Sequence, residues 1–302
     1  MAVYLRDVMD HVVDVKASLT STFGSILNLD STKKLSRKLA GAAACSAQWA
    51  TDVGNEYGQV LQCVLTTSEG GGLQMARGLV RRYQDAGVEP PKAIYVDRDY
   101  CGQSVRKLFH GWEDIIVRLD IWHFMCRLAR GVRTESHQLY GVFMARLSSC
   151  IFEWDPDDYS ELCRAKAARL KVSTTEARQF LDHRELALHC RRRTRPTAVI
   201  TSLISQLIDS MSGDSGRDRL GLELFDVDVM TRVWANEKKH VQCLQDPDPA
   251  AVHLYTETGS LVKGGIHLKT YRCGRGTVSL ESFHRHLVTF IPGQQFSSAM
   301  IV

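Results

Sequence analysis

The chain has 302 residues, of which 44% are hydrophobic and 24% charged, with a formal net charge of +4. This composition is typical of a globular protein and excludes an intrinsically disordered chain. The small basic excess is compatible with a nucleic-acid partner but does not by itself indicate one. No apolar run is long enough to span a membrane, and charged residues interrupt residues 1–23. We therefore expect a protein of the nucleus or cytoplasm that is neither secreted nor membrane-bound.

The first half of the chain has the pattern of three strands followed by alternating helices and strands. Apolar residues spaced by three and four over residues 3–20 predict a leader helix within 1–23. Period-two or continuous apolar runs predict strands at 25–30, 45–53, 58–67, 93–96 and 115–119. Helical spacing predicts helices at 73–86, 103–109 and 121–132.

The strand pattern largely disappears between residues 135 and 269, where helices are predicted. These helices cover 139–150, 160–170, 175–188, 198–211 and 227–239. A further helix at 277–287 then carries Glu281 in its first turn, after the glycines Gly274 and Gly276. We interpret the stretch as an all-helical insertion within one domain. The predicted division is 24–134 for the first part of the core, 135–270 for the insertion and 271–302 for completion of the core.

Three acidic residues lie where they could form a metal site. Asp30 ends the first predicted strand, Asp97 ends the fourth, and Glu281 opens the last helix. If the first strand is central and the fourth lies beside it, the two aspartates lie side by side. Neighbouring carboxylates repel one another unless cations neutralise them, and Mg²⁺ and Mn²⁺ prefer oxygen ligands. We therefore predict a two-ion site for Mg²⁺ or Mn²⁺ that supports phosphodiester chemistry. Each acid could instead serve only its turn or its helix end.

The order of these motifs resembles that of DNA transposases with a ribonuclease H-like catalytic core, especially Mutator-like and transposon-derived relatives. The matching features are the two strand-end aspartates and the Thr277-x-x-x-Glu281-x-Phe-His pattern, over residues 24–132 and 271–292. The family often carries a Cys-x-x-His element after the second aspartate. This chain has Asp120-Ile121-Trp122-His123 there, so only His123 matches.

The resemblance implies an α/β fold, with a ribonuclease H-like mixed sheet and an all-helical insertion before the last core helix. It also implies metal-dependent cleavage and joining of DNA strands, DNA as the partner, a possible homo-oligomer as the active unit, and a nuclear location. One alternative is a domesticated, catalytically inactive relative that binds DNA or another protein. A remote alternative is a glycosyltransferase whose metal site is the Asp-x-Asp of Asp97 and Asp99.

Several basic and histidine side chains are candidates for contacts with nucleic acid. Basic runs bind phosphate backbones, although they are also common as solvated surfaces. Spacing by three and four places Glu281, His284 and Arg285 on one helix face, where a phosphate contact or a plain surface role is expected. The candidates are Lys33, Lys34, Arg37, Lys38, His123, Arg191, Arg192, Arg193, His284 and Arg285.

Overall fold

The structure is a computed structural model that describes residues 16–17, 20–34, 47–67, 72–97 and 103–290. The predicted leader helix lies almost entirely outside these residues. The chain divides into two compact units, the first made of Met1–Val117 with Arg275–Val302 and the second of Arg118–Gly274. The second unit therefore begins before the helix predicted at 121–132, which had been assigned to the first part of the core.

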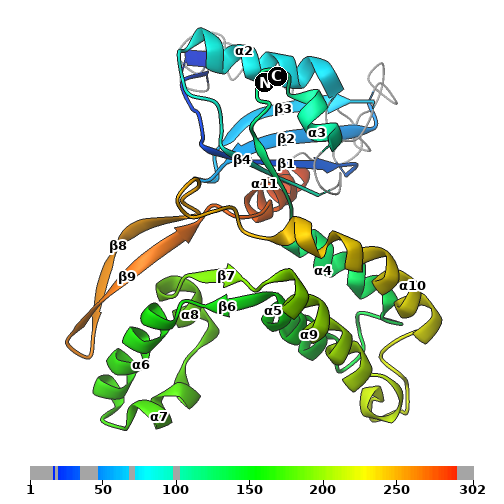
Figure 1. The fold of residues 1–302 in the computed structure, drawn as a ribbon, viewed down its shortest axis with the longest axis vertical. Coiled ribbons are helices and arrows are strands. Elements are labelled where there is room, and N and C mark those ends of the chain that lie inside the picture. Colours follow the sequence, from blue (N-terminus) through cyan, green and yellow to red (C-terminus); the bar gives the residue numbers. More distant parts are fainter. Residues whose placement is uncertain (1–15, 18–19, 35–46, 68–71, 98–102, 291–302) are drawn as a thin grey trace. The chain divides into compact units, whose positions relative to one another are not determined.

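The first unit is built around a mixed five-stranded sheet with the order β3-β2-β1-β4-β5. β1 is antiparallel to β2, β2 is antiparallel to β3, and β1 is parallel to β4. The expectation that the first strand is central, with the fourth beside it, is therefore confirmed (Figure 1). The strands are β1 (Ile26–Thr32), β2 (Trp49–Asn55), β3 (Val60–Thr66), β4 (Ala93–Val96) and β5 (Ile116–Leu119).

Helices cover both faces of this sheet. Helices α2 (Gly72–Asp85) and α3 (Gln103–Leu108) lie on one side and α11 (Val278–Phe290) on the other (Figure 1). Side chains alternate between the faces of a strand. Leu27 and Leu29 consequently join the apolar core with Leu79 of α2. Asn28 and Asp30, which alternate with them along β1, point to the side of α11.

The second unit contains seven α-helices among the described residues and a well-packed apolar core that includes Phe124, Phe143 and Phe225. The α-helices are α4 (Ile121–Leu128), α5 (Tyr140–Ile151), α6 (Pro156–Leu170), α7 (Thr174–Ala177), α8 (His183–His189), α9 (Thr197–Ser210) and α10 (Val227–Glu237). The 3₁₀ helices are Ala129–Gly131, Arg178–Phe180, Gly213–Gly216 and Lys238–Leu244.

The prediction of an all-helical insertion is wrong, because two antiparallel strand pairs lie in this unit. The shorter pair is β6 (Phe152–Trp154) with β7 (Arg192–Thr194), and the longer is β8 (Tyr255–Lys263) with β9 (Ile266–Cys273). Gly264 and Gly265 connect β8 to β9, and both have positive φ, as a tight hairpin turn requires. One face of β9 packs against α6 and α8, whereas most of β8 is exposed.

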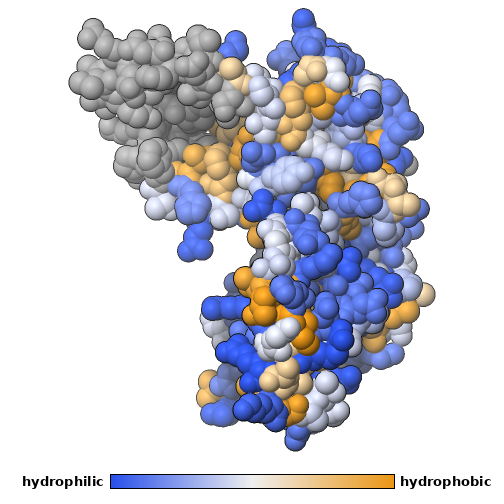
Figure 2. All heavy atoms as spheres, turned by 90° about the vertical axis from the view of Figure 1, so that its left-hand side faces the viewer, coloured by the Kyte–Doolittle hydropathy of each residue, from blue (hydrophilic) through white to orange (hydrophobic). Residues whose placement is uncertain are grey.

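The surface on the side of this hairpin mixes hydrophilic and hydrophobic side chains (Figure 2). Leu261 and Val262 of β8 are among the exposed large hydrophobic residues. Within the described part of the chain, none of the helices combines the length and apolar character needed to cross a membrane.

Candidate metal and carboxylate site

Two buried aspartates face each other across the centre of the sheet in the first unit. Asp30 of β1 is paired directly with Asp52 of β2, and the two residues are only 3% and 0% exposed. Like charges at directly opposed positions of neighbouring strands repel, and burial increases that repulsion because water no longer screens it. The pair therefore requires a neutralising partner.

His284 of α11 supplies this partner. Its Nε2 lies 2.5 Å from Oδ2 of Asp52, and its Nδ1 lies 3.3 Å from Oδ2 of Asp30. The imidazole is itself buried, with 3% of the residue exposed. Burial alone lowers the pKa of His284. The contacts with Asp30 and Asp52 and their negative charges outweigh this effect and raise the pKa to about 9.

Helix α11 reaches the sheet because its apolar residues flank His284 at helical spacing. Leu287 packs against Ala50 of β2, and Leu280 packs on Gly54 of the same strand. A Cβ atom at Gly54 would lie 3.0 Å from Cδ2 of Leu280 and 3.3 Å from the carbonyl oxygen of Gln59, so a larger residue would require a small shift of these neighbours. Residues 280, 284 and 287 form one stripe on the helix, and this stripe directs His284 onto the aspartates.

Glu281 lies next to this stripe and close to Asp30. One carboxylate oxygen of Glu281 and one of Asp30 are within 4.8 Å of each other. Oxygens on opposite sides of a Mg²⁺ ion are about 4 Å apart, because each Mg–O distance is about 2.0–2.1 Å. The two carboxylates therefore fit a divalent cation with only a small adjustment. They form an acidic cluster that could hold a metal ion.

Asp97 follows β4 at the position next to Asp30. Val96 is the parallel partner of Leu29, so the residues that follow each of them occupy matched positions on neighbouring strands. Asp97 is partly exposed. Both aspartates are thus one residue past the last β1–β4 pair, and among the described residues Asp97 is not one of those whose donor atoms gather around Asp30. Asp99, which the glycosyltransferase alternative needs, lies outside the described residues.

The position of Asp30 differs in one detail from the prediction. The sequence placed Asp30 at the end of the first strand, whereas β1 continues to Thr32 and pairs with β2 along this length. Asp30 is therefore held within the sheet on the β2 side and lies at the edge of the pairing with β4, which ends at Leu29.

The expectation of a surface or phosphate-contacting role for His284 is wrong, because the imidazole is buried against two carboxylates. Its neighbour Arg285 is exposed. Lys33 lies with its Nζ 4.4 Å from the centre of the Trp49 ring, and Lys34 is exposed. Arg37 and Lys38 lie outside the described residues.

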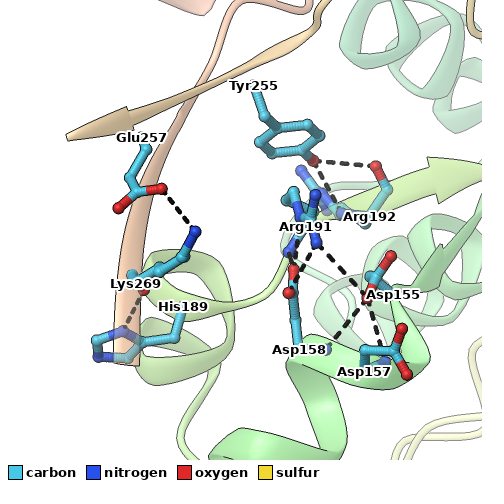
Figure 3. Close-up of polar contacts among 9 residues, drawn as sticks. All are labelled: Asp155, Asp157, Asp158, His189, Arg191, Arg192, Tyr255, Glu257 and Lys269. Atoms are coloured by element: carbon cyan, nitrogen blue, oxygen red, sulfur yellow. Dashed lines mark hydrogen bonds and ion pairs between the residues drawn. The ribbon is translucent and has the colours of Figure 1, made fainter. Parts of the chain in front are cut away.

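The basic run of the second unit is largely engaged in contacts within that unit (Figure 3). Arg191 donates from Nε and Nη2 to the two carboxylate oxygens of Asp158, at 2.7 and 2.9 Å. These hydrogen bonds outweigh burial and raise the pKa of Arg191. The guanidinium of Arg192 lies over the Phe152 ring, and Arg193 pairs with Glu153. These side chains join β7 to β6 and α6, and the charges of Arg191 and Arg193 are paired with acids.

His123, the residue that matched the family element, also belongs to the second unit. Asp120 caps the N-terminus of α4 by accepting a hydrogen bond from the backbone N–H of His123 at 2.9 Å. The Nδ1 atom of His123 lies 3.2 Å from the same Asp120 oxygen. Asp120, at the position where the family has cysteine, therefore has a capping role.

Asp52 is the residue that the sequence analysis missed. It lies in Ala50-Thr51-Asp52-Val53, in a strand whose residues are nearly all buried. The acid within this apolar strand could have indicated a buried partner, since a carboxylate is rarely buried without one.

No protein-family model matches the chain, and no curated protein matches it.

Proposed function

We propose that the chain is a transposase-derived, ribonuclease H-like core that binds Mg²⁺ or Mn²⁺ and cleaves or joins DNA phosphodiesters. Asp30, Asp97 and Glu281 are the proposed ligands. The strand order supports this proposal, because the sheet is mixed and its first strand is central and lies parallel to the fourth.

The closeness of Glu281 to Asp30 is the observation that carries the proposal. The two residues are separated by nearly the whole chain, and the second unit lies between them in sequence. A third acid on a separate helix is unnecessary for folding the sheet. Its placement beside Asp30 is what a pair of oxygen ligands for a cation requires.

Each residue of the proposed site has a separate role. Bound divalent cations would supply activation of a water or 3′-hydroxyl and stabilisation of the leaving oxygen. The carboxylates of Asp30 and Glu281 would hold the ion, and Asp97 would bind from the neighbouring strand. The exposed Lys34 and Arg285 could contact the phosphate backbone of the substrate near the site.

A second candidate function is a catalytically inactive relative that binds DNA or a protein partner. It is favoured by the contact between His284 and Asp30. This imidazole, with at most a single positive charge, balances one of the two buried carboxylates without any metal ion.

The test is calorimetric titration of the full chain with Mn²⁺, comparing wild type with Asp97→Asn, alongside a plasmid-nicking assay. The matched control is Asp85→Asn, which removes an exposed acid of α2 that pairs with Arg81 in the same unit. We expect Mn²⁺ binding and nicking by wild type and by the control. Asp97→Asn should lose nicking and weaken Mn²⁺ binding, because it removes one anionic ligand.

The outcomes separate the two candidates. Binding of Mn²⁺ without nicking by wild type would support the inactive relative and contradict the enzyme. Failure of wild type to bind Mn²⁺ at millimolar concentration would contradict the metal site itself. An equal effect of Asp85→Asn and Asp97→Asn would show that only general charge matters.

A further inference from the structure

We propose that Asp52 and His284 are positioning residues that fix the carboxylate of Asp30 for cation binding. This inference rests on the proposed metal site and adds two residues that are not ligands themselves. The contacts form a chain in which Asp52 orients His284, and His284 in turn orients Asp30.

The carboxylate of Asp30 is held at both oxygens. Its Oδ1 accepts a hydrogen bond from the backbone N–H of Ser31 at 2.9 Å, and its Oδ2 lies 3.3 Å from Nδ1 of His284. This hydrogen bond and this ion pair together restrict the rotation of the carboxylate plane. Each oxygen keeps a further lone pair, so the group can still bind a cation.

The imidazole is held in turn by Asp52. The distance of 2.5 Å between Nε2 of His284 and Oδ2 of Asp52 is the shorter of its two carboxylate contacts. Asp52 is fully buried in the second strand of the sheet, between Asp30 on β1 and Cys63 on β3. Its backbone is therefore fixed by pairing on both sides. Residues that orient a metal ligand through hydrogen bonds raise metal affinity by keeping the ligand preorganised.

Stability alone does not account for this arrangement. The neighbouring positions of the α11 stripe, Leu280 and Leu287, are apolar and pack on the sheet. A buried ionic cluster can often be replaced by apolar residues of similar volume without loss of stability. An Asp-His-Asp series at this point of an otherwise apolar contact is explained by the need to orient Asp30.

The test uses Mn²⁺ titration of the full chain, with urea unfolding of the metal-free protein measured in parallel. Asp52→Ala removes the anchor of His284, whereas Asp52→Asn keeps an oxygen that accepts from Nε2–H. The control is Thr51→Val, in the same strand and equally buried, which removes the contact of 2.8 Å between Oγ1 of Thr51 and Oγ of Ser31.

We expect Asp52→Ala to weaken Mn²⁺ binding about 10- to 100-fold, the usual effect of removing an orienting partner. Asp52→Asn should recover most of this affinity. Thr51→Val should bind Mn²⁺ as wild type does even though it lowers the unfolding free energy. If Asp52→Ala does not fold, His284→Gln takes its place. It replaces two ring nitrogens, each near one carboxylate, with a single amide nitrogen, so weaker binding is again expected.

Two results would overturn the positioning role while the metal site stands. One is wild-type affinity in Asp52→Ala or His284→Gln. The other is equal weakening by Thr51→Val, which would indicate general destabilisation. Absence of Mn²⁺ binding by wild type would instead overturn the metal site and this inference together.

Discussion

On one face of the five-stranded sheet Leu27, Leu29 and Val53 pack with α2, while on the other Asp30 and Asp52 lie beneath α11. Alternate residues of the same two strands build both faces. The apolar face stabilises the fold by removing hydrocarbon from water. On the polar face, His284 offsets the repulsion between the two buried aspartates. This face also carries the candidate site. The pleat of these strands thus places the apolar core on one face and the candidate site on the other.

Removal of the His284 side chain should give the largest loss of unfolding free energy. His284→Ala leaves Asp30 and Asp52 buried without their shared partner, and breaking a buried ion pair in this way costs about 3–5 kcal/mol. Urea unfolding at neutral pH in a chelator measures the loss. The control is His286→Ala on the exposed side of α11, where a change within about 0.5 kcal/mol is expected. Equal effects of the two substitutions would contradict the role of His284.

The polar face should also make stability depend on pH in the metal-free protein. The folded pKa of His284 is about 9, above its ordinary value of 6.5. The resulting stabilisation is complete below about pH 6.5 and is lost progressively as the pH rises to about 9. The slope over this window is about 1.4 kcal/mol per pH unit. Unfolding free energies of wild type and His284→Ala, measured from pH 6 to 10, should converge on the alkaline side. A constant difference would contradict this coupling.

A conservative change on the apolar face should have the smallest effect. Ile94 of β4 is fully buried in the core with α2. Ile94→Val removes one methylene and should lower the unfolding free energy by about 0.5–1.5 kcal/mol. Mn²⁺ affinity should stay unchanged, since the site lies on the other face. A loss of affinity comparable to that of Asp52→Ala would show that the two faces are not independent.

Most of the fold of the first unit was predictable, because local periodicity and turns define its elements. The predicted strand at 93–96 has the same bounds as β4, and the helix predicted at 73–86 differs from α2 by one residue at each end. The β8–β9 hairpin was missed, although Gly264 and Gly265 separate two runs of alternating residues, which is a hairpin pattern. Its many exposed residues hid that pattern, because only one side of β9 is buried.

The candidate site was predictable only in part. Asp30, Asp97 and Glu281 were predicted from their places at the ends of expected elements, although β1 in fact continues past Asp30 to Thr32. The burial of His284 does not follow, because helical spacing gives the stripe of Leu280, His284 and Leu287 but not what it contacts. Asp52 was missed for the same reason: its partner is 232 residues away in sequence.

That sequence separation also bears on synthesis. Asp52 leaves the ribosome long before His284, and at about 5–20 residues per second the interval is roughly 10 to 50 seconds. During this interval β1 and β2 can pair and α2 can cover their apolar face, while the two aspartates stay hydrated. The arrival of α11 then removes the water from both carboxylates in a single late step, after the whole second unit has been made.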